Sequence, residues 1–354
     1  MPFRGSHQPG IDTPAARLGL LAAFNLVHED RIRLAKSLRD LTDEARGLME
    51  ARPPERRDTA YPPTETGILG PDGRTDGLAV TVSVGASLFD DRFGLADRRP
   101  AKLYRLAPFP RDALEPERSD GDLLVMVAAD LPETAAAAVD GYARLADGAA
   151  EPRWSQAGFI RPGRGTPRNL LGFKDGSMNP RRPWDLDRHV WVRTGDRTWM
   201  VGGTYLIYRR IRFELAGWKE LPVADQERII GRHKISGAPL GHAHEFDPRP
   251  LEELPPDSHV RSAAAMSNRG AAMLRRGYSY VDGPDDAGLV FLAFQQDPRR
   301  QFAPVMARLA EQDALRRHVV HTGSTVFALP PPAGLGRLAR SPGGRGAGVL
   351  NGGH

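Results

Sequence analysis

An internal repeat in the order of predicted elements constrains the fold of this chain more than any other feature of its sequence. In the first half, an apolar run at residues 19–27 precedes an amphipathic helix predicted over 28–50. The apolar side chains of that helix recur every three or four residues and share one face; they are Leu34, Leu38, Leu41, Ala45 and Leu48. In the second half, residues 204–215 alternate as a half-buried strand does, and a helix is predicted over 223–232.

The second part of the repeat is a buried strand, a turn with proline and another helix. Residues 122–130 form an apolar run, and Pro132 opens a helix predicted to reach Leu145. Residues 288–297 form a similar run, and the helix after Pro298 has an apolar face made by Phe302, Val305, Met306 and Leu309. A strand–helix–strand–strand–helix–strand order, present twice, predicts an α+β fold of two ferredoxin-like domains, each a sheet with helices packed on it.

The domain boundary is expected where glycine and proline concentrate, at residues 147–165. This composition predicts an N-terminal ferredoxin-like domain over 1–150 and a C-terminal one over 151–332. The low-complexity residues 333–354 are predicted to form a flexible tail.

Composition excludes several classes of site. The chain of 354 residues has no cysteine, which excludes disulfides, zinc–thiolate sites, iron–sulfur clusters and a thiolate ligand to iron. The net charge is +5, and 44 of the 49 basic residues are arginines interleaved with acidic residues. Because no basic stripe with interleaved aromatic residues is present, we expect no nucleic-acid partner.

Neither a membrane span nor a leader is predicted. No apolar stretch approaches the ~18 residues that a transmembrane helix needs. The first residues, MPFRGSH, lack the apolar core of a signal peptide. As written, the chain is therefore expected to be soluble and cytoplasmic.

Histidine pairs give weak signals. His242 and His244 flank one alanine and could ligate a metal on one side of a strand, but the prolines around them favour a loop. His318 and His321 have the spacing of one helical face, and a solvated helix end explains them as well.

The most informative stretch is residues 170–180, LLGFKDGSMNP. It places the carboxylate of Asp175 between Lys174 and Gly176, and glycine lets the backbone turn sharply and approach a ligand closely. An ordinary Asp-Gly turn accounts for the same letters.

The motif at 172–176, GFKDG, resembles the GxxDG signature of dye-decolorizing (DyP-type) haem peroxidases, and the continuation to Asn179-Pro180 also fits that family. Further segments agree in order, so that the resemblance covers roughly residues 5–332. The similarity is greatest to the EfeB-like branch, which includes exported members. The supporting segments are HQPGI at 7–11, GRHK with GAPL at 231–240, DSHVR at 257–261, LRRGYSY at 274–280 and HTGS at 321–324.

The resemblance implies the family's barrel of two ferredoxin-like α+β domains and a cofactor, haem b (iron protoporphyrin IX), in the C-terminal domain. It implies that His259 is the axial ligand of the iron and that Asp313 accepts a hydrogen bond from the second nitrogen of that imidazole. Three further residues are implied to contact the cofactor: Arg276, Lys174 and Gly176.

The resemblance also implies the catalytic pair. Asp175 corresponds to the acid–base group that moves a proton between the two peroxide oxygens. Arg275 corresponds to the cation that stabilises charge on the leaving oxygen, with Arg276 as the neighbour that could be confused with it.

The sequence departs from the family pattern in three respects. The family continues HxRxANPR after the ligand histidine, whereas residues 259–266 read HVRSAAAM. Met178 stands where a small or polar residue is usual. The twin-arginine leader of exported members is absent, and the chain is expected to be exported if such a leader has been removed.

The predicted function is a haem-dependent peroxidase that reduces hydrogen peroxide while oxidising dye-like or phenolic molecules by one-electron steps. The expected partners are hydrogen peroxide and an organic reductant, with a possible homo-oligomer. The alternatives are a haem deferrochelatase that releases iron, and a haem-binding relative without peroxidase activity. Bulky dyes would need a surface radical, for which the candidates are Tyr278, Tyr280, Trp184, Trp191 and Trp199.

Overall fold

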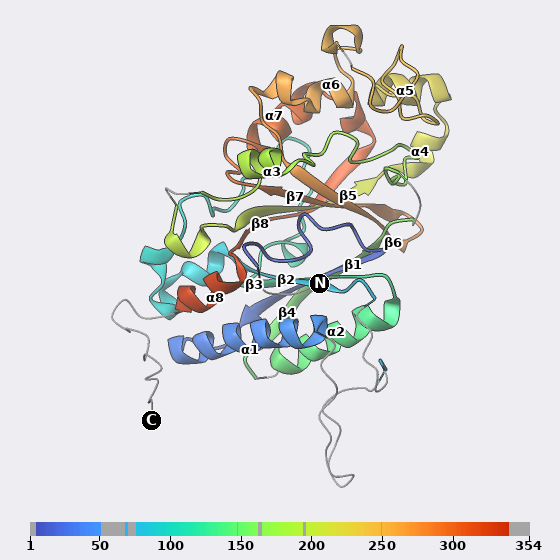
Figure 1. The fold of residues 1–354 in the computed structure, drawn as a ribbon. Helices are drawn as coiled ribbons and strands as arrows, with labels where there is room; N and C mark the ends of the chain where they lie inside the picture. The colour runs from blue at the N-terminus through green and yellow to red at the C-terminus, as the bar shows by residue number, and fades with distance from the viewer. Residues whose placement is uncertain are drawn as a thin grey trace, which may run out of the picture.

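The computed structural model describes residues 5–50, 68–69, 76–146, 148–161, 165–193, 196–248 and 250–339. Within these ranges, eight antiparallel strands close into one barrel, in the order β1-β3-β2-β8-β5-β7-β6-β4 (Figure 1). The strands are β1 (Leu18–Leu26), β2 (Ala79–Gly85), β3 (Leu123–Ala129), β4 (Ala150–Phe159), β5 (Thr204–Phe213), β6 (Leu274–Gly283), β7 (Asp286–Gln295) and β8 (Val319–Leu329).

The predicted internal repeat is confirmed. The first unit runs β1, α1 (Arg31–Met49), β2, β3, α2 (Pro132–Ala146), β4, and the second runs β5, α5 (Val223–Ile230), β6, β7, α7 (Phe302–Gln312), β8. Both units have the same strand order, β4-β1-β3-β2 and β8-β5-β7-β6, which is the ferredoxin-like arrangement. The remaining α-helices are α3 (Pro183–His189), α4 (Leu215–Lys219), α6 (His259–Ala263) and α8 (Pro332–Ala339).

The helices of each unit cover the outside of its own strands, α1 and α2 at one end of the molecule and α5 to α7 at the other (Figure 1). Helix α1 begins where Asp30 accepts hydrogen bonds from the N–H groups of Ile32 and Arg33. Its apolar face packs on the strands, and alternate strand residues fill the barrel with a second apolar cluster. That cluster includes Trp154, Tyr208, Tyr278, Phe294 and Phe327.

Two segments differ from the sequence-based expectation. Strand β4 occupies much of the stretch predicted as a linker, and it pairs with β1 from Leu18↔Phe159 to Leu26↔Ala150. Its glycine and proline residues are typical of loops, although its side chains alternate between exposed and buried as those of a strand do. The division into domains at residue 150 stays a prediction, because one barrel joins both units.

The expected tail is the second difference. Residues 332–339 form α8, on which Leu335 and Leu338 are fully buried, so the apolar side chains of this low-complexity stretch hold it against the fold. The remaining residues of the predicted tail, 340–354, lie outside the described residues.

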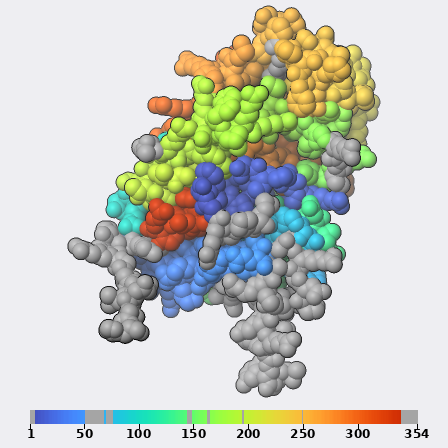
Figure 2. All heavy atoms as spheres, in the orientation of Figure 1, coloured from blue at the N-terminus to red at the C-terminus, as the bar shows by residue number. Residues whose placement is uncertain are grey.

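The N-terminal segment ties the two units together. Gln8 donates hydrogen bonds to the carbonyl oxygens of Val82 and Pro330, both at 2.7 Å. Figure 2 shows this segment (dark blue) crossing one face of the molecule between the two units. None of the helices in the described ranges combines the length and the hydropathy that a membrane crossing requires.

Candidate active site

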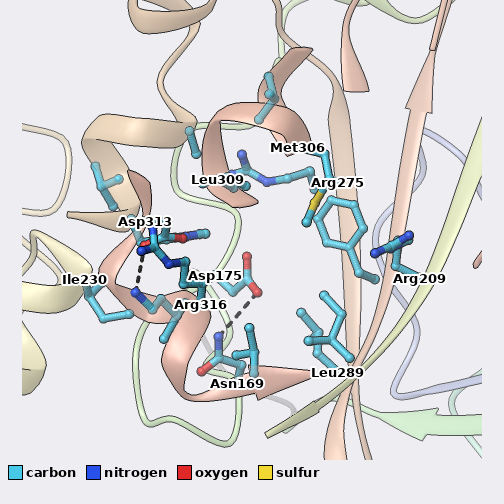
Figure 3. A pocket seen from close by; sticks show the side chains of 18 of the residues that line it. Asn169, Asp175, Arg209, Ile230, Arg275, Leu289, Met306, Leu309, Asp313 and Arg316 are labelled. Atoms are coloured by element: carbon cyan, nitrogen blue, oxygen red, sulfur yellow. Dashed lines mark hydrogen bonds and ion pairs between the residues drawn. The ribbon is translucent and has the colours of Figure 1, made fainter. Parts of the chain in front are cut away.

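A cavity of about 300 Å³ lies in the second unit, between its helices and the outer side of its strands (Figure 3). This volume is within the range of small-molecule and cofactor sites. Its walls are mainly apolar and come from the loop at 169–178, from β5 and β7 and from α7. The apolar lining includes Leu171, Phe173, Ile211, Leu289, Phe291 and Phe302.

His259 opens α6 and borders this cavity, with 36% of its side-chain surface accessible. Its Nδ1 lies 2.7 Å from Oδ2 of Asp313, which is buried where α7 ends, and Oδ1 of Asp313 accepts the N–H of Leu315 at 2.9 Å. Burial lowers the pKa of His259, but the charge and hydrogen bond of Asp313 outweigh it and raise this pKa above its usual value. With Nδ1 as the donor, Nε2 presents a lone pair, and no hydrogen bond to Nε2 occurs among the described residues.

Asp175 lies on the loop that precedes α3 and borders the same cavity. Its N–H donates to the carbonyl oxygen of Pro167 at 2.8 Å, and its Oδ2 lies 3.5 Å from Nδ2 of Asn169 (Figure 3). Gly176 follows with φ of +102°, a conformation that favours glycine. The loop can therefore turn immediately after the carboxylate.

Arg275 and Arg276 are neighbours on β6, so their side chains leave the strand on opposite faces. Arg275 borders the cavity, and its guanidinium forms no hydrogen bond or ion pair with any described residue. Arg276 is buried on the other face, where it donates to the carbonyl oxygens of Ile11 (3.0 Å) and Thr13. Arg276 is not among the residues that line this cavity, because β-strand alternation directs its side chain to the N-terminal segment. Its contact with the cofactor stays a prediction.

We expect Arg276→Ala to destabilise the fold and to leave the cavity intact. The change removes a buried cation from carbonyl groups that then lack a donor, at a cost of about 2–3 kcal/mol. Urea unfolding measures this cost, and Arg300→Ala, at an 89% exposed side chain, is the matched control with an expected change within about 0.5 kcal/mol. An Arg276→Ala protein as stable as wild type would show that these contacts contribute nothing.

Lys174 borders the cavity, but its ammonium group is bound elsewhere. Its Nζ lies 2.5 Å from Oε2 of Glu245, and Oε1 of Glu245 accepts the hydroxyl of Ser177 at 2.8 Å. Burial raises the pKa of Glu245, but the hydrogen bonds from Lys174 and its neighbours outweigh burial and lower this pKa. Glu245 thus holds the chain on both sides of Asp175. Sequence reasoning missed this residue because Glu245 lies 71 residues from Lys174 along the chain.

The structure adds His321, which lies on β8 and not on a helix, so the helical-face interpretation was wrong. His321 borders the cavity and accepts a hydrogen bond from Nε of Arg209 at 3.2 Å, while Arg209 pairs with Asp112 at 2.5 Å. Burial, with the charge of Arg209, lowers the pKa of His321 well below its usual value. The arginines that line the cavity are Arg111, Arg209, Arg232, Arg275 and Arg316.

The segment that departs from the family pattern after His259 forms a compact turn. The amide of Asn268 donates to the carbonyl oxygens of Ser262 and Ala264, both at 2.8 Å. The missing Asn-Pro-Arg therefore does not prevent His259 from meeting Asp313. No group of three or more histidine, aspartate or glutamate side chains suited to a metal ion occurs among the described residues, His242 and His244 included.

The candidate radical residues differ in exposure. Trp184, in α3, is 57% exposed, and Arg182 lies over its ring. The other four are buried: Trp191, Trp199, Tyr278 and Tyr280. A route for an electron through these residues stays a prediction.

A barrel of two ferredoxin-like units carries one apolar cavity that is lined by an imidazole–carboxylate pair, an aspartate and an arginine. This is the arrangement expected of a haem peroxidase. The family models for the N-terminal and C-terminal parts of Dyp-type peroxidases match residues 8–160 and 166–333. The chain therefore belongs to the Dyp-type peroxidase family.

Relatives and solved structures agree over nearly the whole chain. The chain is 37% identical in sequence to the deferrochelatase of Escherichia coli K12, and the match covers 93% of this chain and 84% of the relative. Ferric DtpA from Streptomyces lividans superimposes with a TM-score of 0.89 at 38% identity, covering 96% of this chain and 97% of that one. A DyP-type peroxidase from Cellulomonas bogoriensis superimposes with a TM-score of 0.86 at 35% identity, covering 94% of each chain.

Proposed function

We propose that the protein binds haem b in this cavity and uses hydrogen peroxide to oxidise organic molecules, dye-like or phenolic, in one-electron steps. The observation that carries the proposal is that His259, with its Asp313 partner, and Asp175 with Arg275 line one cavity. The residues present fit haem: the apolar walls suit a porphyrin, Nε2 of His259 suits its iron and the arginines suit its carboxylates.

His259 would hold the iron through Nε2. Asp313 keeps the proton on Nδ1, fixes the ring orientation and makes the imidazole a stronger electron donor. When bound, haem supplies the redox centre at which peroxide is reduced and from which organic molecules are oxidised. Lys174 and Gly176 contribute by holding the loop that forms one wall of the cavity.

Asp175 and Arg275 would act on peroxide. A carboxylate oxygen of Asp175 accepts the proton of one peroxide oxygen and returns it to the other, which leaves as water. The guanidinium of Arg275 stays charged, donates hydrogen bonds to the departing oxygen and stabilises the negative charge that builds on it. Because no described residue occupies this guanidinium, it is available for that task.

A second cavity of about 570 Å³ adjoins the first and shares Asp175, Gly176 and Arg275 with it. It therefore offers a route to the catalytic pair that does not cross the haem site. The lining includes Phe246, which is 60% exposed, with the guanidinium of Arg181 5.1 Å from the centre of its ring. An aromatic ring beside a cation favours aromatic reductants.

Release of iron from haem is the second candidate, and the relatives named deferrochelatase favour it. One preparation of haem-loaded protein separates the two. Peroxidase activity predicts that peroxide and a phenol are consumed with a stoichiometry near one to two, and that no free porphyrin forms. Iron release predicts porphyrin fluorescence under anaerobic, reducing conditions. No consumption of peroxide would refute the peroxidase proposal and would leave a haem carrier.

A further inference from the structure

Asn179 forms an unusual contact with β6, the strand that carries Arg275. Its side-chain amide holds both polar groups of the Arg275 backbone: Nδ2 donates to the carbonyl oxygen at 2.7 Å, and Oδ1 accepts the N–H at 3.1 Å. A side-chain amide presents a donor and an acceptor in the same arrangement as a peptide group. Asn179 therefore takes the place of a neighbouring strand residue beside Arg275.

The sheet explains why Arg275 needs such a partner. Strand β6 pairs with β7 along its length, from Leu274↔Phe294 onward, but its other neighbour, β4, meets it only at Phe159↔Ser279. The N–H and carbonyl groups that β6 turns away from β7 near Arg275 therefore have no strand opposite them. Asn179 satisfies these groups and fixes the backbone from which the guanidinium extends.

The same residue is tied to the loop that carries Asp175. The N–H of Asn179 donates to the carbonyl oxygen of Gly176 at 3.1 Å, which closes a turn one residue after the carboxylate. A Cβ atom at Gly176 would lie 3.3 Å from Nδ2 of Asn179, so this glycine lets the turn and the amide coexist. Two hydrogen bonds from the Asn179 side chain thus connect the Asp175 loop to the Arg275 strand, and the hydrogen bond from its N–H holds Asn179 within that loop.

We propose that Asn179 is a positioning residue that sets the placement of the Arg275 guanidinium relative to the Asp175 carboxylate. The inference rests on the proposed peroxidase function. Asn179 borders the second cavity and not the cavity proposed for haem, so it acts through Arg275 and not on the cofactor. Its loss is expected to slow the reaction with peroxide while haem binding and the step with the reductant are retained.

The chain supplies a matched control in its first unit. The amide of Gln8 holds the backbone of Val82, on β2, in the same way, with Nε2 to the carbonyl oxygen at 2.7 Å and Oε1 to the N–H at 2.8 Å. Strand β2 occupies the place in the first unit that β6 occupies in the second. Gln8→Ala therefore removes a comparable contact at a residue that lines neither of the two cavities.

The experiment measures the rate of the peroxide-induced absorbance change in haem-loaded wild type, Asn179→Ala, Asn179→Asp and Gln8→Ala. For each protein it also records the thermal unfolding curve and the rate at which a phenol reduces the oxidised haem. A displacement of about 1 Å at a reacting group can cost about 100-fold in rate. We therefore expect a fall of about 100-fold in the rate with peroxide in Asn179→Ala, with an unchanged ferric spectrum and an unchanged rate of reduction by the phenol. Asn179→Asp keeps the acceptor for the Arg275 N–H and loses the donor, so an intermediate rate is expected.

Gln8→Ala is expected to unfold at a lower temperature and to react at the wild-type rate. The proposal is overturned if Asn179→Ala reacts with peroxide as fast as wild type does. It is also overturned if the rate falls as much in Gln8→Ala as in Asn179→Ala. Where Asn179→Ala does not fold, a wild-type rate in Asn179→Asp overturns the proposal equally. A wild-type protein that binds haem and does not react with peroxide would instead refute the proposed function, and the inference with it.

Discussion

Asp175→Asn and Arg275→Leu are each expected to slow the reaction of the haem-loaded protein with hydrogen peroxide by about 10²- to 10⁴-fold. Asparagine keeps the shape of the aspartate and cannot accept the peroxide proton. Leucine keeps the bulk of the arginine stem and removes both the charge and the hydrogen-bond donors. The measurement is the bimolecular rate of the absorbance change after rapid mixing with peroxide.

The two changes are expected to be non-additive, because both groups act on the same pair of oxygens. The double variant should therefore be about as slow as the slower single variant. Arg276→Ala is the informative comparison, since its guanidinium lies one residue away and on the other face of β6. A loss of rate in Arg276→Ala that equals the loss in Arg275→Leu would contradict the assignment of the two arginines.

His259→Ala is expected to abolish imidazole ligation of the iron and to weaken haem binding by more than the 10- to 100-fold that loss of an outer partner of a metal ligand typically costs. Asp313→Asn should show that smaller loss. Because the Asp313 charge makes the imidazole a stronger donor, Asp313→Asn is also expected to raise the reduction potential of the bound iron. Haem titration followed by absorbance, with a potentiometric titration of each variant, measures both effects.

His321 and His318 are the controls for the ligand assignment. Among the described residues, His259 and His321 are the imidazoles that line the cavity, while His318 packs against the ring of Trp218 outside it. His321→Ala and His318→Ala are both expected to keep the ferric spectrum of an imidazole-ligated haem. If His321→Ala lost that spectrum and His259→Ala kept it, the ligand would be His321.

The fold class could be predicted because its signals are local. The spacing of Leu34, Leu38 and Leu41 indicates the helix that the structure places over Arg31–Met49, and the run at 122–130 contains β3. Strand β4 was missed because its proline and glycine residues are typical of loops, whereas its pairing with β1 is a long-range contact. The burial of α8 depends in the same way on partners that are distant in sequence.

The site could be predicted only in part. The motif letters identified Asp175, Arg275, His259 and Asp313, and the structure brings all four to one cavity. Their roles came from resemblance and stay proposals. The sequence motif could not show that Arg276 binds the N-terminal segment, because the residues in that contact are more than 260 positions apart in the sequence. It also could not show that Glu245 holds Lys174 or that Asn179 holds the Arg275 backbone, since each contact depends on which loop the fold lays beside which strand.

The proposed function requires that His259 holds haem iron in a cavity where Asp175 and Arg275 act on peroxide. The absorption spectrum of the haem-loaded protein, before and after one equivalent of hydrogen peroxide, is the most direct test. We expect the Soret band of a ferric, histidine-ligated haem that converts to that of an oxidised haem and returns when a phenol is added. A protein that takes up no haem, or a Soret band that only bleaches, would contradict it.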